Sequence, residues 1–411
     1  MGPGRPGSVS RDEGVLFLRS SIRRAGAVVL SMTVLIGLTG PGPANASAAA
    51  DSGRGTVRQA MAGLVATGTA GVQVRLHDDR GDWTGSAGER ELGRHRSPST
   101  DGKFRAGSTT KTFVATVVLQ LVGEGKLELD APVDRYLPRF GLDRRITVRM
   151  LLQHTSGLFD YIGDTSPDGA TFEPGIPLVG KEGVANRFHR YLPDELVRLS
   201  LAKPARFAPG TQWRYSNTNY VLAGLLVEQA TSTSYATQVE RRILQPLRMH
   251  DTSLPGARTT IPGDHAHAYQ AYQDNRRLTT VDVTRQSTTW AWAAGEIVST
   301  TKDLDRFITA LTGGKLLSPE LYAEMRRMRE AGSANRQYGL GLAQYRLAPD
   351  CVVVGHVGEI PGYKTYLLST PDGSRRLELS ATQGALDYQD KAGQEKVEKA
   401  EGKLVVAALC G

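Results

Sequence analysis

A serine and a lysine one helical turn apart place the strongest constraint on this chain. Ser108 and Lys111 lie at the start of a predicted helix over about 109–124, where a spacing of three residues puts both side chains on one face. A lysine amine within hydrogen-bond reach can take the proton of a serine hydroxyl if the amine is neutral. Burial and the positive end of the helix both disfavour the ammonium form. The pair predicts a nucleophile with its base, although the four-residue pattern alone is common.

Two further motifs follow in the chain. The phenol of Tyr215 can relay protons, and the amide of Asn217 can hydrogen-bond a substrate carbonyl; the alternative is a polar turn that caps the next helix. His356 and Gly358 follow a run of valines typical of a strand. The histidine can stabilise the tyrosine or a leaving group, and the glycine lets a strand edge lie close to a substrate backbone. Together, the three weak signals predict one active site.

In this order, the motifs Ser-x-x-Lys, Tyr-x-Asn and His-x-Gly resemble the serine penicillin-recognising family of DD-peptidases, class C β-lactamases and related esterases. The similarity is strongest to secreted D-alanyl-D-alanine carboxypeptidases and extends to residues 152–158, 290–295 and 299–304. It implies an α+β class and the β-lactamase/DD-peptidase fold. In that fold an antiparallel sheet flanked by helices is interrupted by a mostly helical domain, and the active site lies at their junction.

The resemblance also implies a mechanism, acyl transfer through a covalent ester on Ser108. Tyr215 would be a proton relay or co-base, and whether it or Lys111 takes the first proton stays open. The backbone N–H groups of Ser108 and Glu359 would form the oxyanion hole, while His356 would support Tyr215 and the departing group. The substrate cleft would be lined by Asn217, Trp290, Gly358 and Glu359.

No metal or organic cofactor is expected. The expected partners are small peptide, peptidoglycan-like or ester substrates, with β-lactams as covalent ligands. The chain lacks the Gly-x-Ser-x-Gly motif of α/β-hydrolases, and it has no His-Glu-x-x-His or paired Cys-x-x-Cys pattern. His265 and His267 could face one metal, but a loop pair of this kind usually binds nothing.

The chain departs from related carboxypeptidases at the positions that hold a substrate's C-terminal carboxylate. An arginine and two threonines are expected there, and this sequence has Ala343, Val357 and Glu359 instead. Arg346 and Lys364 are nearby cations, but neither is at a matching position. Three functions remain open: a carboxypeptidase with altered recognition, an esterase or amidase of the D-aminopeptidase type, and a non-catalytic penicillin-binding sensor.

The first 46 residues are predicted to be a secretory signal peptide. Two arginines precede an apolar run over 25–39, which is too short to span a bilayer comfortably, and small residues follow. Secretion without a stable membrane anchor is therefore expected. Removing residues 1–46 takes away five arginines and two acids, so the formal charge falls from +8 to about +5. That mild, scattered charge gives no nucleic-acid signal.

Cys351 and Cys410 are the chain's two cysteines, and both lie in the exported part. In an oxidising compartment an even pair predicts a disulfide, with two buried free thiols as the alternative. The family resemblance supports the disulfide, because related carboxypeptidases carry cysteines at both places.

Residues 51–411 are predicted to form one hydrolase domain, with a sheet part over about 51–113 and 288–411 and a helical part over about 114–287. The segment 160–190 is expected to be a long surface loop near the site. Early and late strands must then pair across the helical part. The predicted helices are 55–68, 109–124, 192–202, 218–231, 301–312, 318–330 and a C-terminal one, and the predicted strands are 71–78, 82–88, 338–347, 351–358, 363–369 and 376–382.

Overall fold

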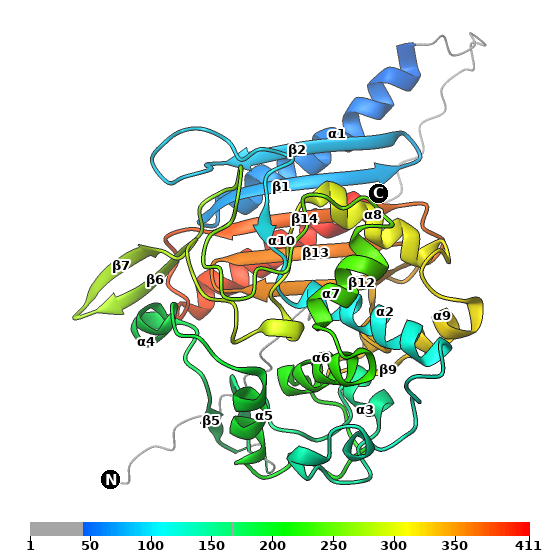
Figure 1. Cartoon of the computed structure of the whole chain (residues 1–411). Helices are drawn as coiled ribbons and strands as arrows, with labels where there is room; N and C mark the ends of the chain where they lie inside the picture. Colours follow the sequence, from blue (N-terminus) through cyan, green and yellow to red (C-terminus); the bar gives the residue numbers. More distant parts are fainter. Residues whose placement is uncertain (1–43, 167, 169) are drawn as a thin grey trace, which may run out of the picture.

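One eight-stranded antiparallel sheet organises the protein (Figure 1). The computed structural model describes residues 44–166, 168 and 170–411. The strand order is β2-β1-β14-β13-β12-β11-β10-β9. Val72 of β1 lies opposite Ala381 of β14, so the predicted pairing of early and late strands is confirmed. The strands are β1 Thr69–Asp78, β2 Gly81–Gly88, β9 Arg329–Glu330, β10 Arg336–Tyr338, β11 Ala343–Ala348, β12 Cys351–Ile360, β13 Tyr363–Ser369 and β14 Arg376–Gln383.

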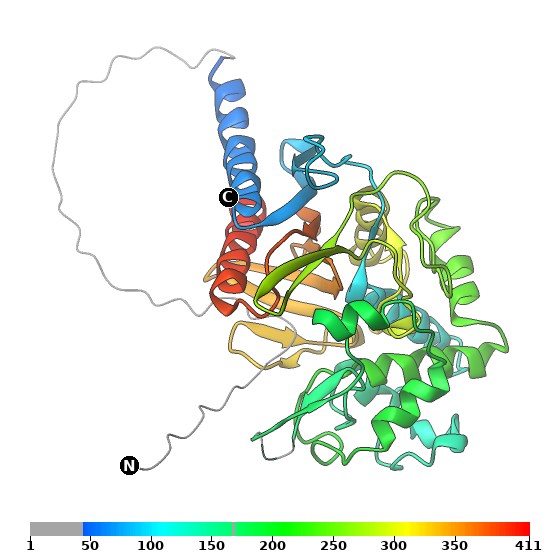
Figure 2. The ribbon, with the colours of Figure 1, turned by 90° about the vertical axis from the view of Figure 1, so that its left-hand side faces the viewer.

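The two faces of the sheet serve two separate cores. Helices α1 (Ala44–Val65) and α10 (Lys391–Leu409) lie side by side on one face (Figure 2). Side chains alternate along each strand, so Val353 and Val357 of β12 join the core beneath these helices, whereas Val354 joins the core of the opposite face. The second core merges with the helical part of the molecule. The active-site helix therefore rests on the face opposite α1 and α10.

Helix α2 (Thr110–Gly123) runs through the second core and is buried on nearly every side. Such a helix is held by packing all round and not by a single apolar stripe. Short strand pairs also occur in this half: β3 (Phe104–Arg105) with β8 (Val298–Ser299), β4 (Gly163–Thr165) with β5 (Phe172–Pro174), and β6 (Tyr269–Asp274) with β7 (Arg277–Asp282). The other helices are α3 Val148–Gln153, α4 Gly180–Asn186, α5 Pro193–Leu201, α6 Asn217–Thr231, α7 Tyr235–Val239, α8 Thr301–Thr312 and α9 Pro319–Met325.

Several predicted boundaries are wrong for local reasons. The strand predicted over 338–347 is the hairpin of β10 and β11, because residues 339–342 form a tight turn in which Gly341 has a φ of +72°. A Cβ at Gly341 would lie 2.4 Å from Ala115 of α2, so this turn packs directly on the active-site helix. The helix predicted over 318–330 ends at Met325, and α1 begins at Ala44 instead of residue 55.

The predicted helical part is more mixed than expected, since it contains the β4–β5 and β6–β7 pairs. The segment 160–190 is not only a surface loop: Asp160 and Tyr161 at its start are buried. His265 and His267 stack at 5.8 Å between ring centroids, and within the described residues no cluster of metal-ligating side chains is found.

The disulfide between Cys351 and Cys410 is formed and joins the start of β12 to the end of α10. Its Cα atoms are 5.7 Å apart, as the pairing requires. The predicted signal peptide falls mostly outside the described residues. Within the part that the structure covers, no helix is both long and apolar enough to cross a membrane.

Candidate active site

Ser108 lies in a tight turn that is pressed against β12. The turn Gly107–Thr109 leads directly into α2, and Gly107 has a φ of +54°. A Cβ at Gly107 would lie 2.7 Å from the backbone nitrogen of Glu359, and a Cβ at Gly358 would lie 1.9 Å from the carbonyl oxygen of Ala106. Neither position can hold a larger residue without moving backbone. The glycine of the His-x-Gly motif therefore makes room for the nucleophile's own turn.

Lys111 is fully buried and contacts three oxygen atoms. Its Nζ lies 3.0 Å from Ser108 Oγ, 2.8 Å from Asn217 Oδ1 and 2.7 Å from the carbonyl oxygen of Ala294. The last two oxygens only accept hydrogen bonds, so a neutral amine gives them its two N–H groups and directs its lone pair at Ser108. Burial lowers the pKa of Lys111 to about 7, against an opposing contribution from Asp160. The predicted nucleophile and base are thus in contact.

Tyr215 completes this group. Burial raises the pKa of its phenol well above the usual value, against an opposing hydrogen-bonding contribution from Ser108. The Tyr215 ring stacks on His154, with centroids 4.2 Å apart. His154 Nδ1 accepts a hydrogen bond from the backbone N–H of Ser216 at 3.2 Å, and burial holds the pKa of this imidazole well below its usual value. A neutral, protonated phenol at Ser108 can donate and accept a proton in turn.

His356 is buried one layer behind Tyr215. Its Nδ1 lies 2.7 Å from the carbonyl oxygen of Val357, and its Nε2 lies 2.9 Å from the hydroxyl of Tyr338. The Tyr338 ring meets the Tyr215 ring edge-on, with centroids 6.5 Å apart. Burial lowers the pKa of His356 to about 3, so the ring is neutral at pH 7. The side chain bonded to His356 is Tyr338, which in turn contacts Tyr215, so His356 supports Tyr215 indirectly.

The edge of β12 beside Ser108 is not paired with another strand. β12 pairs with β11 only as far as Gly355, but with β13 as far as Ile360, so residues 356–360 have one unpaired edge. Val357 donates its backbone N–H to the hydroxyl of Tyr345 on that edge. Because backbone direction repeats every second residue, the N–H of Glu359 points the same way, toward Gly107. The two amides predicted for the oxyanion hole are therefore close neighbours.

The side chain of Glu359 does not enter a closed cleft. It is 55% exposed and forms an ion pair with Lys364 at 3.3 Å, and Lys364 also lies 3.8 Å from Glu401 of α10. Arg346 donates to the carbonyl oxygen of Pro349 at 3.0 Å and is exposed. The two cations named from the sequence as substitutes for the missing clamp are thus engaged elsewhere.

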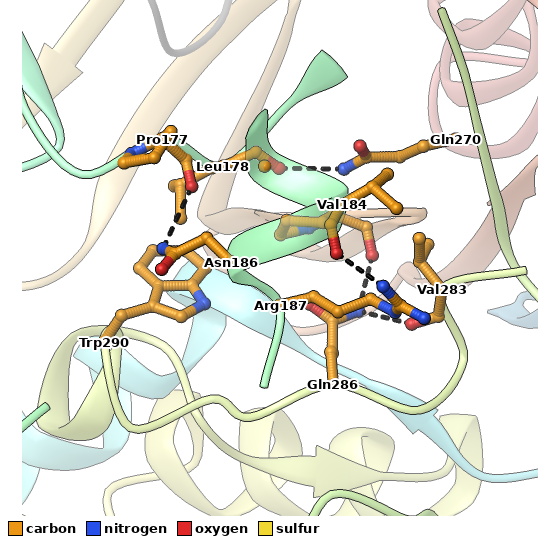
Figure 3. Close-up of a pocket in the computed structure, with 11 residues that line it drawn as sticks. Pro177, Leu178, Val184, Asn186, Arg187, Gln270, Val283, Gln286 and Trp290 are labelled. Carbon is orange, nitrogen blue, oxygen red and sulfur yellow. Dashed lines mark hydrogen bonds between the residues drawn. The ribbon is translucent and has the colours of Figure 1, made fainter. Parts of the chain in front are cut away.

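Trp290 lines a narrow pocket (Figure 3). Leu178, Val184 and Val283 supply further apolar wall, and Pro361 follows the last residue of β12. Gln286 holds two segments of the pocket lining together, because its side-chain amide donates to the carbonyl oxygens of Val283 at 2.9 Å and Pro361 at 2.8 Å. The pocket is built largely from segment 176–187, which the sequence alone presented as a loop without periodicity.

Asp160 and His154 are site residues that the sequence reasoning did not select. Asp160 is buried and accepts a hydrogen bond from Asn217 Nδ2 at 3.0 Å, while the other end of this amide holds Lys111. His154 ends α3 with a φ of +61° beneath Tyr215. A single acid inside the apolar run Leu158 to Tyr161 was the available signal, since an acid there must be either exposed or paired.

Comparisons with known proteins agree with this geometry. A sequence profile of the β-lactamase family matches residues 54–409. The structure of a D-stereospecific amidohydrolase from Streptomyces sp. is 35% identical, with a TM-score of 0.75, over 87% of this chain and 98% of that one. D-amino acid amidase from Ochrobactrum anthropi SV3 is 26% identical with a TM-score of 0.72, over 87% and 98% of the two chains.

Two curated relatives have other activities in their names. Penicillin-binding protein 4* of Bacillus subtilis is 28% identical over 71% of this chain, and esterase EstB of Burkholderia gladioli is 38% identical over 41% of it. The chain spans 63% and 42% of the length of these two relatives. The names of these four proteins point to different substrates. The chain belongs to the β-lactamase family, which is part of a superfamily of serine hydrolases that work by acyl transfer.

Proposed function

We propose that this protein is an active-site-serine amidohydrolase for D-amino-acid derivatives whose leaving group carries no free carboxylate. One observation carries the proposal: Ser108 and Lys111 are in contact, while the positions expected to hold a substrate carboxylate are Ala343, Val357 and Glu359. Arg346 and Lys364 are occupied by other partners. The likeness to a D-stereospecific amidohydrolase and a D-amino acid amidase supports the same choice.

In the proposed mechanism Lys111 is the base. Ser108 Oγ forms a bond to the substrate carbonyl carbon as its proton moves to Lys111 Nζ, and the carbonyl electron pair becomes an oxyanion beside the amides of Ser108 and Glu359. The carbonyl re-forms as the carbon–nitrogen bond breaks, and the proton held by Lys111 passes through Tyr215 to the leaving amine. Water then bonds to the acyl carbon as it gives a proton to Lys111; the bond from that carbon to Ser108 Oγ breaks, Ser108 takes the proton back, and the carboxylic acid leaves. The high pKa of Tyr215 favours this division of roles, since a protonated phenol is a donor and not a first base.

The alternatives rest on weaker support. A D-alanyl-D-alanine carboxypeptidase is favoured by the penicillin-binding relative and the His-x-Gly motif, but it needs a cation for the carboxylate. Esterase activity is a second outcome that the same nucleophile allows, as the similarity to EstB suggests. A non-catalytic penicillin sensor is supported by no observation here beyond the family resemblance, whereas Lys111 in contact with Ser108 is the arrangement of a nucleophile with its base. The disulfide supports export to an oxidising compartment.

The test compares three substrates that share one D-acyl group and differ in the C-terminal group. The purified chain is assayed on an N-acyl-D-Ala-D-Ala free acid, on its C-terminal amide and on the matching ester, with D- and L-phenylalanine amide as a second pair and Ser108→Ala as the blank. The amide is expected to exceed the free acid in kcat/KM by about tenfold or more, the value of a lost charge-assisted contact. Faster turnover of the free acid than of the amide would identify the protein as a carboxypeptidase. Equal rates on D- and L-phenylalanine amide would contradict the proposed preference for D-amino-acid derivatives.

If the free acid is the better substrate, Arg336 is the cation to examine first. It lies on β10 with its guanidinium 4.7 Å from the centre of the Trp213 ring, and its charge acts on both Tyr215 and His356. Arg336→Gln would then lower the rate on the free acid but leave the rate on the amide unchanged.

A further inference from the structure

A chain of three hydrogen bonds links the nucleophile to a buried carboxyl group. Ser108 Oγ contacts Lys111 Nζ at 3.0 Å, Lys111 contacts Asn217 Oδ1 at 2.8 Å, and Asn217 Nδ2 donates to Asp160 Oδ2 at 3.0 Å. The side chain of Asn217 is the bridge, because its two ends hold a base and an acid. The four residues come from the turn Gly107–Thr109, from α2, from α6 and from the segment after α3, and none of them is exposed.

Asp160 is not balanced by a direct ion pair with any residue that the structure describes. Its other oxygen accepts the backbone N–H of Ile162 at 3.3 Å. Burial raises the pKa of Asp160 to about 7, and the charge of Lys111 opposes that rise. The neighbouring carboxyl of Asp164 has its own arginine partners, Arg214 at 3.2 Å and Arg206 at 3.9 Å. The cation that faces Asp160 is therefore Lys111.

Other ionisable groups around this pair do not replace Asp160. On the Asp160 side they are Tyr161, Asp164 and Tyr215, and on the Lys111 side they are His154, His356, Tyr215 and Tyr220. The tyrosines are uncharged at neutral pH because burial raises the pKa of each. The two histidines are neutral because burial lowers the pKa of each. Asp160 is the carboxylate bonded to the residue that holds the base.

We propose that Asp160 is a positioning residue of the acylation step, which fixes the amide of Asn217 and compensates the positive charge that forms on Lys111 when it accepts the proton of Ser108. The role rests on the proposed function only for Lys111 as the base, and not for the identity of the substrate. Asp160 touches neither substrate nor nucleophile. It acts on Lys111 indirectly, by orienting Asn217 and by its negative charge.

A purely structural role predicts a different behaviour. Asp160 also anchors the turn at Ile162, so its removal could loosen the segment and lower every rate in proportion. Such loosening would leave the pKa of Lys111 in place or, by admitting water, raise it, because burial is what lowers that pKa. A charge within a few ångströms, by contrast, shifts the pKa of its neighbour by about one to three units. The position of the acidic limb of the pH profile separates the two roles, and it is independent of the fraction of protein that is folded.

The experiment measures the rate at which a fluorophosphonate labels Ser108 between pH 5 and 9, since this probe needs the nucleophile and base but no particular substrate. Asp160→Asn keeps an oxygen for Asn217 and removes the charge. The acidic limb should move to lower pH by about one unit or more, because the lost anion had favoured the ammonium form of Lys111. The plateau rate should fall, since the cation formed during acylation loses its partner. Asp164→Asn is the matched control and should leave the limb in place.

Two results would overturn the proposal. One is an acidic limb that stays at the wild-type pH in Asp160→Asn, or that moves equally in Asp164→Asn. The other is complete loss of labelling in a folded Asp160→Asn protein, because a positioning residue whose hydrogen bond is preserved cannot be indispensable. Failure of the proposed substrate class would leave the fluorophosphonate result unaffected, so the two failures are distinguishable.

Discussion

The floor and the wall of the active site are built on opposite plans. The floor comprises Lys111, Asp160, Asn217 and the half-buried Tyr215; the first three are buried and hydrogen-bonded in a row through Asn217, and Lys111 lies 4.7 Å from the centre of the Tyr215 ring. The wall, residues 356–360 of β12, has one unpaired edge and carries an exposed ion pair at Glu359. Buried polar networks fix geometry tightly because an unpaired member is costly, whereas exposed charges can be exchanged at little cost. The floor therefore sets the chemistry, and the wall is where relatives of this fold can differ in substrate.

The largest expected loss of activity comes from substitutions of the nucleophile and of the floor residues around it. Ser108→Ala should reduce hydrolysis by at least about 10⁴-fold, since no other nucleophile contacts Lys111 in the described site. Lys111→Ala should be nearly as severe. Tyr215→Phe should cost about 10²–10³-fold, the usual value of a proton relay. Mass spectrometry after incubation with a fluorescent penicillin or a fluorophosphonate should find the adduct on Ser108, with circular dichroism as the control for folding. Labelling that persists in Ser108→Ala would sink the assignment of the nucleophile.

The floor was largely predictable from the sequence because its chemistry needs fixed residue types at fixed spacing. Ser108 and Lys111 are one turn apart, Asn217 begins α6 and Tyr215 lies two residues before it, and both contact Lys111. Asp160 was not predicted, since its role depends on burial and on a contact with Asn217 that lies 57 residues further along the chain. His154 was missed for a similar reason: it acts through stacking on Tyr215, which no periodicity in the sequence encodes.

The wall was harder to predict because its geometry depends on strand pairing between distant segments. The sequence indicated strands near the right places, but not that β12 continues past the end of its pairing with β11. The turn at Gly341 was read as strand, since the apolar residues around it fit either structure and only its packing on Ala115 decides. The pairing of Glu359 with Lys364 likewise requires the register of β12 and β13.

The second prediction concerns how the wall is anchored. The bond between Cys351 and Cys410 closes a sequence separation of 59 residues and ties the start of β12 to α10. Cys351→Ser with Cys410→Ser should lower the free energy of unfolding by about 4 kcal/mol, because the unfolded chain gains freedom. Denaturant unfolding measures this, and reduced wild-type protein is the control. Labelling of Ser108 in the folded double variant should persist, since the floor does not contact the disulfide. Loss of labelling before unfolding would show that floor and wall are one unit.

The smallest effect tests whether the wall charge selects substrates. Glu359→Gln removes the anion beside Ser108 and leaves Lys364 its ion pair with Glu401. The ratio of kcat/KM for an N-acyl-D-Ala-D-Ala free acid over its amide should rise by about two- to fivefold, the range of an exposed charge interaction. Glu398→Gln is the matched control, because Glu398 also acts on Lys364 but lies on α10. A shift of equal size in both variants would assign the effect to the general field of the surface. No change in either variant would mean that selection against the carboxylate comes only from the missing cation, which is the arginine expected at the position of Ala343.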